Sequence, residues 1–144
     1  MDKELPKQYD PKLAKDQCLK FWEEKGYFHA RPENPAESYS IVIPPPNVTG
    51  ALHLGHALNN TLQDILARQH RARGFDVCWV PGTDHAGIAT QTVVEKELKK
   101  QKITRHELGR EKFVDEVWKW KNEYGDRIYR QMRRLGDSCD WERA

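Results

Sequence analysis

The sequence has few cysteines, no long apolar run and almost no net charge. Its three cysteines, Cys18, Cys78 and Cys139, are odd in number and far apart. This favours reduced thiols in a cytoplasmic protein over a disulfide framework. No apolar run approaches the roughly 18 residues of a membrane span, and the N-terminal M-D-K-E-L-P-K lacks the apolar segment of a signal peptide. A formal net charge of +2 is too small to indicate nucleic-acid binding by itself.

The chain is long enough for one ordinary domain. Its 144 residues are 38% hydrophobic and 32% charged, which predicts a single core under a heavily charged surface. Asp10 and Pro11 have the pattern of a helix start, and Gly26 is the predicted stop. An apolar stripe on this helix consists of Ala14, Cys18, Phe21 and Trp22. A loop over residues 29–38 follows.

A strand is predicted at residues 39–43, where the most informative stretch of the chain begins. This run is mostly apolar and β-branched, which predicts a strand covered on both faces. Residues 44–46 are three prolines, and they end the strand because proline has no N–H to donate to a ladder. Residues 47–50 then turn the chain.

A helix is predicted from about Leu54 to Arg73, followed by a second strand over residues 75–80. The helix has one apolar stripe, the pattern of a helix face packed on a core. The stripe consists of Leu54, Leu58, Leu62, Ile65 and Leu66. A strand–helix–strand unit predicts a parallel pair, so the fold class is α/β. The two strand ends then share one edge, where open α/β folds bind ligands.

Two further helices are predicted after the loop at residues 82–91. Thr104 and Glu107 fit a capping box, and apolar residues recur at helical spacing over residues 113–135, with Gly136 as the C-cap. Two glycines mark positions where this helical region could break, Gly109 and Gly125. Four arginines are interpreted as a solvated face rather than an RNA-phosphate patch: Arg127, Arg130, Arg133 and Arg134.

His53 and His56 are the candidate functional residues of the first loop. Their i, i+3 spacing at a helix start places both imidazoles near free first-turn amides and the positive end of the helix dipole. This combination suits a polyanion such as a chain of phosphates. Gly55, between them, would let a flat ring lie on the backbone.

Two alternatives to phosphate binding remain for these histidines. The first is helix capping. The second is a zinc site that adds Asp84 and His85, but no cysteine lies nearby and no glutamate follows His53, as an H-E-x-x-H site requires. No metal site is therefore predicted.

The stretch P-P-P-N-V-T-G-A-L-H-L-G-H-A-L, residues 44–58, resembles the HIGH signature of class I aminoacyl-tRNA synthetases, with HLGH in place of HIGH. K-F-W-E-E-K-G-Y-F and R-R-L-G-D-S-C-D-W-E-R, near the two ends, resemble other segments of that family. P-G-T-D-H-A-G-I-A-T-Q resembles the valyl branch, because related enzymes usually carry tryptophan where Thr83 stands. The resemblance covers nearly the whole chain.

The resemblance implies a partial Rossmann-like nucleotide-binding fold and an ATP-dependent ligase. In such enzymes valine attacks ATP, with Mg²⁺ carried by ATP, and the valyl group then passes to tRNA(Val). His53 and His56 would stabilise charge on the phosphates, Thr49 and Gly50 would shape the phosphate turn, and Gly55 would support adenine.

The amino acid would be bound by the ends of both strands. Pro44 and Asn47 would contact the amino acid or the adenylate. Asp84 would hold the α-ammonium group from the facing loop, because a carboxylate can pair with that charge. Asp84 could instead cap the helix that begins near Ala86.

The second signature of class I synthetases, the KMSKS loop, has no match in the chain. Editing and anticodon-binding segments are also missing, so residues 1–144 are expected to be the N-terminal half of the catalytic nucleotide-binding domain, as a monomer. A non-catalytic nucleotide- or RNA-binding module derived from the same fold is the alternative.

Overall fold

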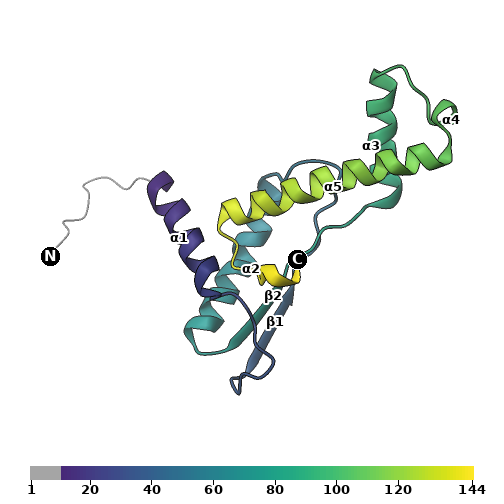
Figure 1. The fold of residues 1–144 in the computed structure, drawn as a ribbon. Coiled ribbons are helices and arrows are strands. Elements are labelled where there is room, and N and C mark those ends of the chain that lie inside the picture. The colour runs from purple at the N-terminus through teal and green to yellow at the C-terminus, as the bar shows by residue number, and fades with distance from the viewer. Residues whose placement is uncertain (1–10) are drawn as a thin grey trace.

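The structure is a computed structural model that describes residues 11–144, with side chains from residue 17 onward (Figure 1). In chain order the elements are α1 (Pro11–Lys25), β1 (Ser38–Val42), α2 (Leu54–Ala72), β2 (Asp76–Val80), α3 (Gly87–Lys100), α4 (Arg105–Leu108), α5 (Arg110–Leu135) and the 3₁₀ helix η1 (Trp141–Arg143). The predicted N-cap at Asp10 and the side chain of Ala14 lie outside the described residues. None of the described helices combines the length and apolar character that a bilayer crossing requires.

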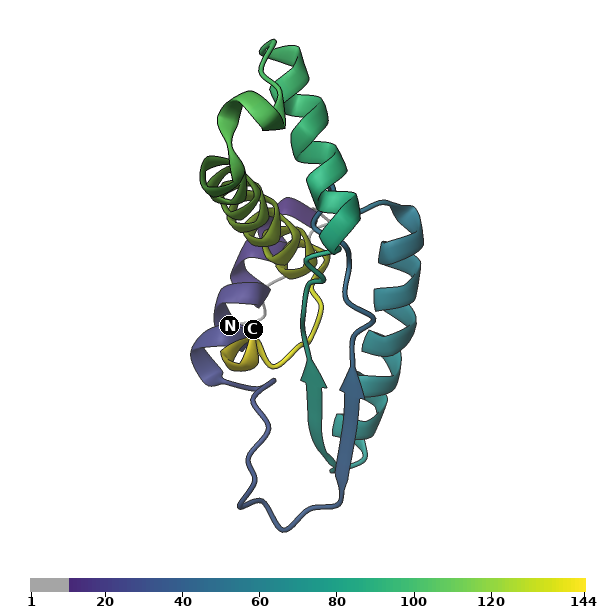
Figure 2. The same cartoon turned by 90° about the vertical axis from the view of Figure 1, so that its right-hand side faces the viewer.

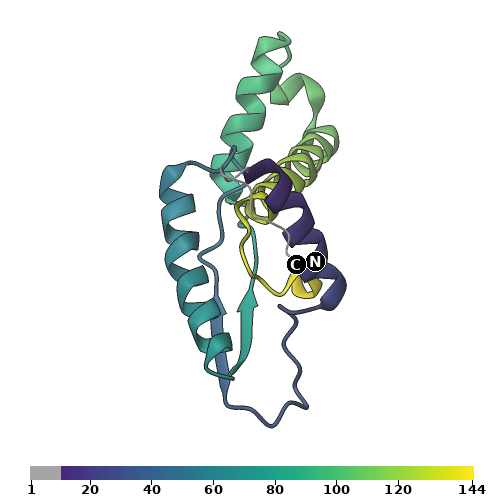
Figure 3. The same ribbon diagram turned by 90° about the vertical axis from the view of Figure 1, so that its left-hand side faces the viewer.

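The two strands form the predicted parallel pair. Ser38 pairs with Asp76 and Val42 pairs with Val80, so the register runs without a break along both strands. α2 supplies the crossover, because parallel neighbours cannot be joined by a tight hairpin. α2 lies on one side of the strands, with α1 and α5 on the other (Figure 2 and Figure 3). The predicted α/β class is confirmed.

The core lies where the ends of the strands, α2, α5 and the C-terminal segment (residues 137–144) meet. Its buried members are Ile43, Val48, Ala67, Val77, Trp79, Ile128, Met132 and Cys139. β1 is not covered on both faces, contrary to the prediction. Ser38, Ser40 and Val42 are exposed, whereas Tyr39 stacks on His70 of α2 with ring centroids 3.6 Å apart. Only the α2 side of β1 is therefore covered.

α2 forms as predicted, but its apolar stripe faces solvent. The exposed fractions of the five stripe residues range from 47% at Leu66 to 88% at Leu54, with Leu58, Leu62 and Ile65 between them. The buried positions of α2 are Asn60 and Ala67. The prediction of a core-facing stripe is wrong, because the inward face of α2 is small and polar and is bound by the C-terminal segment.

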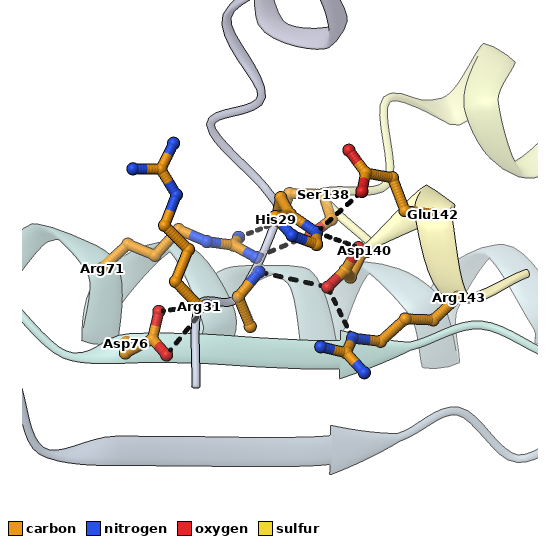
Figure 4. Close-up of polar contacts among 9 residues, drawn as sticks. His29, Arg31, Arg71, Asp76, Ser138, Asp140, Glu142 and Arg143 are labelled. Carbon is orange, nitrogen blue, oxygen red and sulfur yellow. Dashed lines mark hydrogen bonds and ion pairs between the residues drawn. The ribbon is translucent and has the colours of Figure 1, made fainter. Parts of the chain in front are cut away.

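The C-terminal segment is held against α2 and β2 by polar contacts. The Asp140 N–H donates to Trp79 O (2.8 Å), which sets this segment beside β2. The Asp140 carboxylate accepts from Ala30 N (3.1 Å), His29 Nδ1 (3.2 Å) and Arg143 Nε (2.9 Å) (Figure 4). Burial alone would raise the pKa of Asp140, but these hydrogen bonds together lower it below its ordinary value. The loop after α1 and the end of the chain are thereby joined.

α3 and α4 project away from the strands and are connected to the body by α5 (Figure 1). The capping box of Thr104 and Glu107 is confirmed. Gly109, at φ 78°, separates α4 from α5, whereas α5 continues unbroken through Gly125. Gly136, in the left-handed region at φ 88°, ends α5 as predicted.

Candidate functional site

The candidate site lies at the shared edge where β1 and β2 end. Beyond the strands, the first loop (residues 43–53) and the second loop (residues 81–86) remain paired through the backbone. The Asp84 N–H donates to Pro46 O (2.9 Å), and the Val48 N–H donates to Asp84 O (2.9 Å). These bonds make an isolated parallel bridge between Asn47 and Asp84. The two loops that carry the sequence signatures therefore face each other, as predicted.

A cavity of about 510 Å³ opens along the first loop and the start of α2. It is lined by Pro44, Pro45, Pro46, Asn47, Thr49, Gly50, Ala51, His53, Gly55, His56 and Asn59. Every residue predicted for the site is among them except Asp84. Asn59 was missed by the sequence analysis, although its position three residues after His56 places it on the same side of the helix.

His53 and His56 form a reciprocal capping box at the start of α2. His53 Nδ1 accepts from the Gly55 N–H (3.1 Å), and His56 Nδ1 accepts from the His53 N–H (3.3 Å). The ring centroids are 3.9 Å apart. The capping alternative is thus realised in the structure, and the predicted first-turn amides are partly used by the histidines themselves.

Capping also fixes the tautomer of both rings. A backbone N–H can only donate, so each Nδ1 is unprotonated and the proton of the neutral imidazole sits on Nε2. Burial, and then the neighbouring His53, lower the pKa of His56 below its ordinary value, which favours the neutral ring. Each ring can then cap with one nitrogen and donate a hydrogen bond with the other.

Gly55 leaves room for the ring beside it. A Cβ at this position would lie 2.9 Å from His53 Cε1 and 3.1 Å from His53 Nδ1, the first closer than real Cβ contacts come. The flat ring that lies on Gly55 in the structure is therefore the imidazole of His53. Contact between Gly55 and adenine stays a prediction.

Asp84 lies outside the cavity, on the facing loop, with an exposed side chain. Its Oδ1 accepts from the Ala86 N–H (2.9 Å). α3 begins at Gly87, and its N-cap residue Ala86 is in the left-handed region at φ 51° with no side-chain cap. Asp84 therefore closes a turn before α3 and does not cap the helix itself. Its role toward an ammonium group stays a prediction.

Helix α5 contacts both loops, which the sequence analysis did not anticipate. Trp120 Nε1 donates to Val48 O (2.8 Å), and Gln131 Oε1 accepts from the Leu52 N–H (3.0 Å). On the second loop, the His85 ring meets Trp118 edge to face at 5.9 Å. The aromatic residues of α5 gave a helical pattern in the sequence, but nothing in that pattern said which loop they would contact.

The same region holds no obvious metal centre. Among the described residues, no group of three or more His, Cys, Asp or Glu side chains is arranged to hold a metal ion. The Nδ1 atoms of His53 and His56 accept from backbone amides, which leaves only Nε2 of each ring for another partner.

Comparisons with known proteins identify tRNA synthetases as relatives of this chain. The family model described as tRNA synthetases class I (I, L, M and V) matches residues 17–144. The valine–tRNA ligase of Geobacter sulfurreducens is 61% identical over 142 residues, which cover 99% of this chain. That of Bdellovibrio bacteriovorus is 57% identical over 144 residues, or 100% of this chain. The Homo sapiens valine–tRNA ligase is 53% identical over 148 residues, which cover 97% of this chain. The chain spans 16%, 16% and 12% of those relatives. A solved structure of Agrobacterium radiobacter K84 agnB2 LeuRS, in a ternary complex with tRNA and LeuAMS, superposes with a TM-score of 0.75 at 26% identity, over 93% of this chain and 15% of that one.

Proposed function

Because the chain belongs to the class I tRNA synthetases, a family that uses ATP, we propose that it forms valyl-adenylate as part of a valine–tRNA ligase. One observation carries the proposal. The residues predicted to bind ATP line a single cavity where the paired loops leave the parallel strands. The 53–61% identity to valine–tRNA ligases supports valine as the amino acid.

We further propose that residues 1–144 are the N-terminal half of the catalytic nucleotide-binding domain. Among the described residues, β1 pairs with β2 along one edge and with no strand along the other. That second edge is open to a further strand. Val42 of β1 is 72% exposed, and the aliphatic stripe of α2 is exposed as well. An open strand edge and an uncovered apolar helix face are what a missing half of an α/β domain would cover.

In the proposed reaction, a carboxylate oxygen of valine attacks the α-phosphorus of ATP. A new P–O bond to valine forms, and the bond to the pyrophosphate leaving group breaks. No enzyme nucleophile is needed, so the protein acts by positioning the reactants and by stabilising charge on phosphate oxygens. The Nε2–H groups of His53 and His56 donate to those oxygens, and Thr49, Gly50 and Gly55 shape the surface on which ATP lies. Mg²⁺ arrives with ATP, and none of these residues is assigned to hold it.

The amino acid binds at the shared edge where the two paired loops leave the strands. Pro44 and Asn47 contact valine or the adenylate. Pro46 O is used by the Asp84 N–H, whereas Pro44 O and Pro45 O have no backbone partner among the described residues. Those carbonyls, with Asp84 Oδ2, accept the protons of the α-ammonium group.

The valyl group then passes to tRNA(Val) in the longer enzyme. We propose a monomeric protein in the cytoplasm, and three free thiols fit a reducing compartment.

The proposal is tested by valine-dependent ATP–pyrophosphate exchange with the purified chain. Exchange is expected, and His53→Ala and His56→Ala should each slow it by about 10- to 100-fold, the worth of a hydrogen bond to a charged group. Asp84→Asn keeps the turn to Ala86, so it should weaken valine binding and leave ATP binding unchanged.

Two outcomes would overturn the proposal. ATP binding that neither valine nor the histidine substitutions alter indicates the alternative, a nucleotide-binding module without catalysis. A folded chain that binds neither ATP nor a valyl-adenylate analogue excludes both functions for residues 1–144.

A further inference from the structure

Helix α5 holds the first loop at two points, one on either side of residues 49–51. Trp120 binds the carbonyl of Val48, and Gln131 binds the amide of Leu52. Val48 is fully buried, and its own N–H is bound by Asp84 O. The backbone at both ends of the turn is therefore fixed.

Residues 49–51 lie between the two anchors and make no hydrogen bond of their own to the rest of the described chain. Yet all three line the candidate cavity. Their position is set by Val48 and Leu52. Leu52 also directly precedes His53, so the Gln131 contact fixes the chain where the capping box begins.

The two anchors belong to one face of one rigid element. Trp120 and Gln131 are 11 residues apart, which is close to three full turns of an α-helix, or about 16 Å along its axis. Trp118, two residues before Trp120 and therefore on another side of the helix, contacts His85 of the second loop. α5 thus links both loops to the same scaffold.

We propose that Trp120 and Gln131 are positioning residues for adenylate formation. Resting on the proposed function, the inference is that α5 keeps residues 49–51 and the ring of His53 in the arrangement that receives the phosphates. Pre-organised donors avoid the cost of ordering the loop when ATP binds. Neither residue lines the cavity, so both act through the backbone they hold.

A purely structural role must be separated from positioning, because Trp120 also stacks on Tyr124 at 4.1 Å. Trp120→Phe removes the donor and keeps an aromatic ring that can still stack on Tyr124. Gln131→Met keeps the length of the side chain and removes the acceptor, whereas Gln131→Glu retains an acceptor oxygen. Asn122→Met is the matched control, since Asn122 is an exposed amide on the same helix.

The experiment measures three quantities in the full chain: the unfolding midpoint, the Kd for a non-hydrolysable valyl-sulfamoyl-adenosine, and ¹⁵N order parameters of residues 49–51. Trp120→Phe and Gln131→Met should each weaken the analogue about fivefold, and the double variant about 20-fold. The order parameters should fall from about 0.85 toward 0.6 in both variants, and remain high in Gln131→Glu and Asn122→Met.

The inference is overturned if the folded double variant has wild-type order parameters at residues 49–51, or binds the analogue with wild-type affinity. If the wild-type chain does not bind the analogue, the proposed function fails separately, and the order parameters alone decide whether α5 positions the loop.

Discussion

The two faces of α2 differ in a way that reverses the usual arrangement. The face toward the C-terminal segment is polar and well bonded: Asn60 Nδ2 donates to Asp137 Oδ2 (2.7 Å), and Asp64 Oδ1 accepts from the N–H of Ser138 (2.9 Å). Arg71 adds two bonds to Ser138, at 2.7 and 2.9 Å. The opposite face carries the exposed aliphatic stripe.

This difference shows which contacts are already complete within residues 17–144. No buried side-chain nitrogen or oxygen of these residues lacks a hydrogen-bond partner, so the buried groups of the polar face need no further partner. The residues of the stripe are 47–88% exposed, so covering what remains of each would contribute roughly 1–2.5 kcal/mol, and this face is where a further partner would bind most favourably.

The largest effect is expected on the polar face, from Asp64→Ala. Asp64 bonds Ser138 through Oδ1 and Arg68 Nε through Oδ2 (2.7 Å). Removing the carboxylate leaves these donors without their acceptor, so the free energy of unfolding should fall by about 2–4 kcal/mol. Urea denaturation measures this loss. Asp126→Ala, at an exposed position on α5, is the control and should change it by less than about 0.5 kcal/mol.

Asp137→Asn should act in the opposite direction on the same face. Burial raises the pKa of Asp137 to about 6, from 3.8. Above pH 6 the carboxylate is charged in both states, and the folded state bears the cost of burying it. Stability is therefore gained as the pH falls from about 6 to 3.8.

Asparagine keeps the bond to Asn60 without the charge. We expect a gain of about 1–2 kcal/mol at pH 7.5 and almost no difference near pH 3, below both pKa values. Denaturation of both proteins at the two pH values checks the sign. A substitution that destabilises the protein at pH 7.5 would show that the charge itself is required by Arg68.

Much of the fold could be predicted from local chemistry. The parallel pair, the capping box at Thr104 and the stop at Gly136 follow from short-range rules on β-branching, caps and left-handed glycine. The direction in which α2 faces could not, because periodicity identifies an apolar stripe without identifying its neighbour. The true neighbour of the inward face is Ser138, 74 residues beyond Asp64.

The same limit applies to the candidate site. His53, Gly55 and His56 could be predicted because they are adjacent in sequence and share one helix start. Trp120 and Gln131 could not, because their contacts cross 72 and 79 residues and leave no trace in local spacing. Long-range contacts of single side chains are set by packing, which one sequence does not display.

Gly55→Ala, in the first turn of α2, should change the affinity for the adenylate analogue more than the free energy of unfolding. The new Cβ would force the ring of His53 aside and remove a cap worth about 1 kcal/mol. Alanine returns about 0.5–1 kcal/mol of helix propensity, so the net stability change should be within about 0.5 kcal/mol. The affinity for the adenylate analogue should fall about tenfold, the worth of one phosphate contact.

Gly125→Ala is the matched glycine control. Gly125 lies inside α5, and a Cβ there would meet nothing within 4 Å. Stability should rise by about 0.5–1 kcal/mol with no change in analogue affinity. If Gly55→Ala binds the analogue as tightly as Gly125→Ala does, the orientation of the His53 ring does not matter for binding.

The smallest effect is expected on the apolar face, from Leu62→Gln. Leu62 is 57% exposed, and glutamine has nearly the same helix propensity as leucine, so the backbone contribution cancels. The free energy of unfolding of the 144-residue chain should change by less than about 0.5 kcal/mol. In a longer chain that includes the proposed second half of the domain, the same substitution places an amide in an apolar contact and should cost about 2 kcal/mol. Urea denaturation of both chains measures the contrast. A loss above about 1.5 kcal/mol in the short chain would mean that the stripe is already covered, and an equal, small change in both would mean that the second half does not pack on α2.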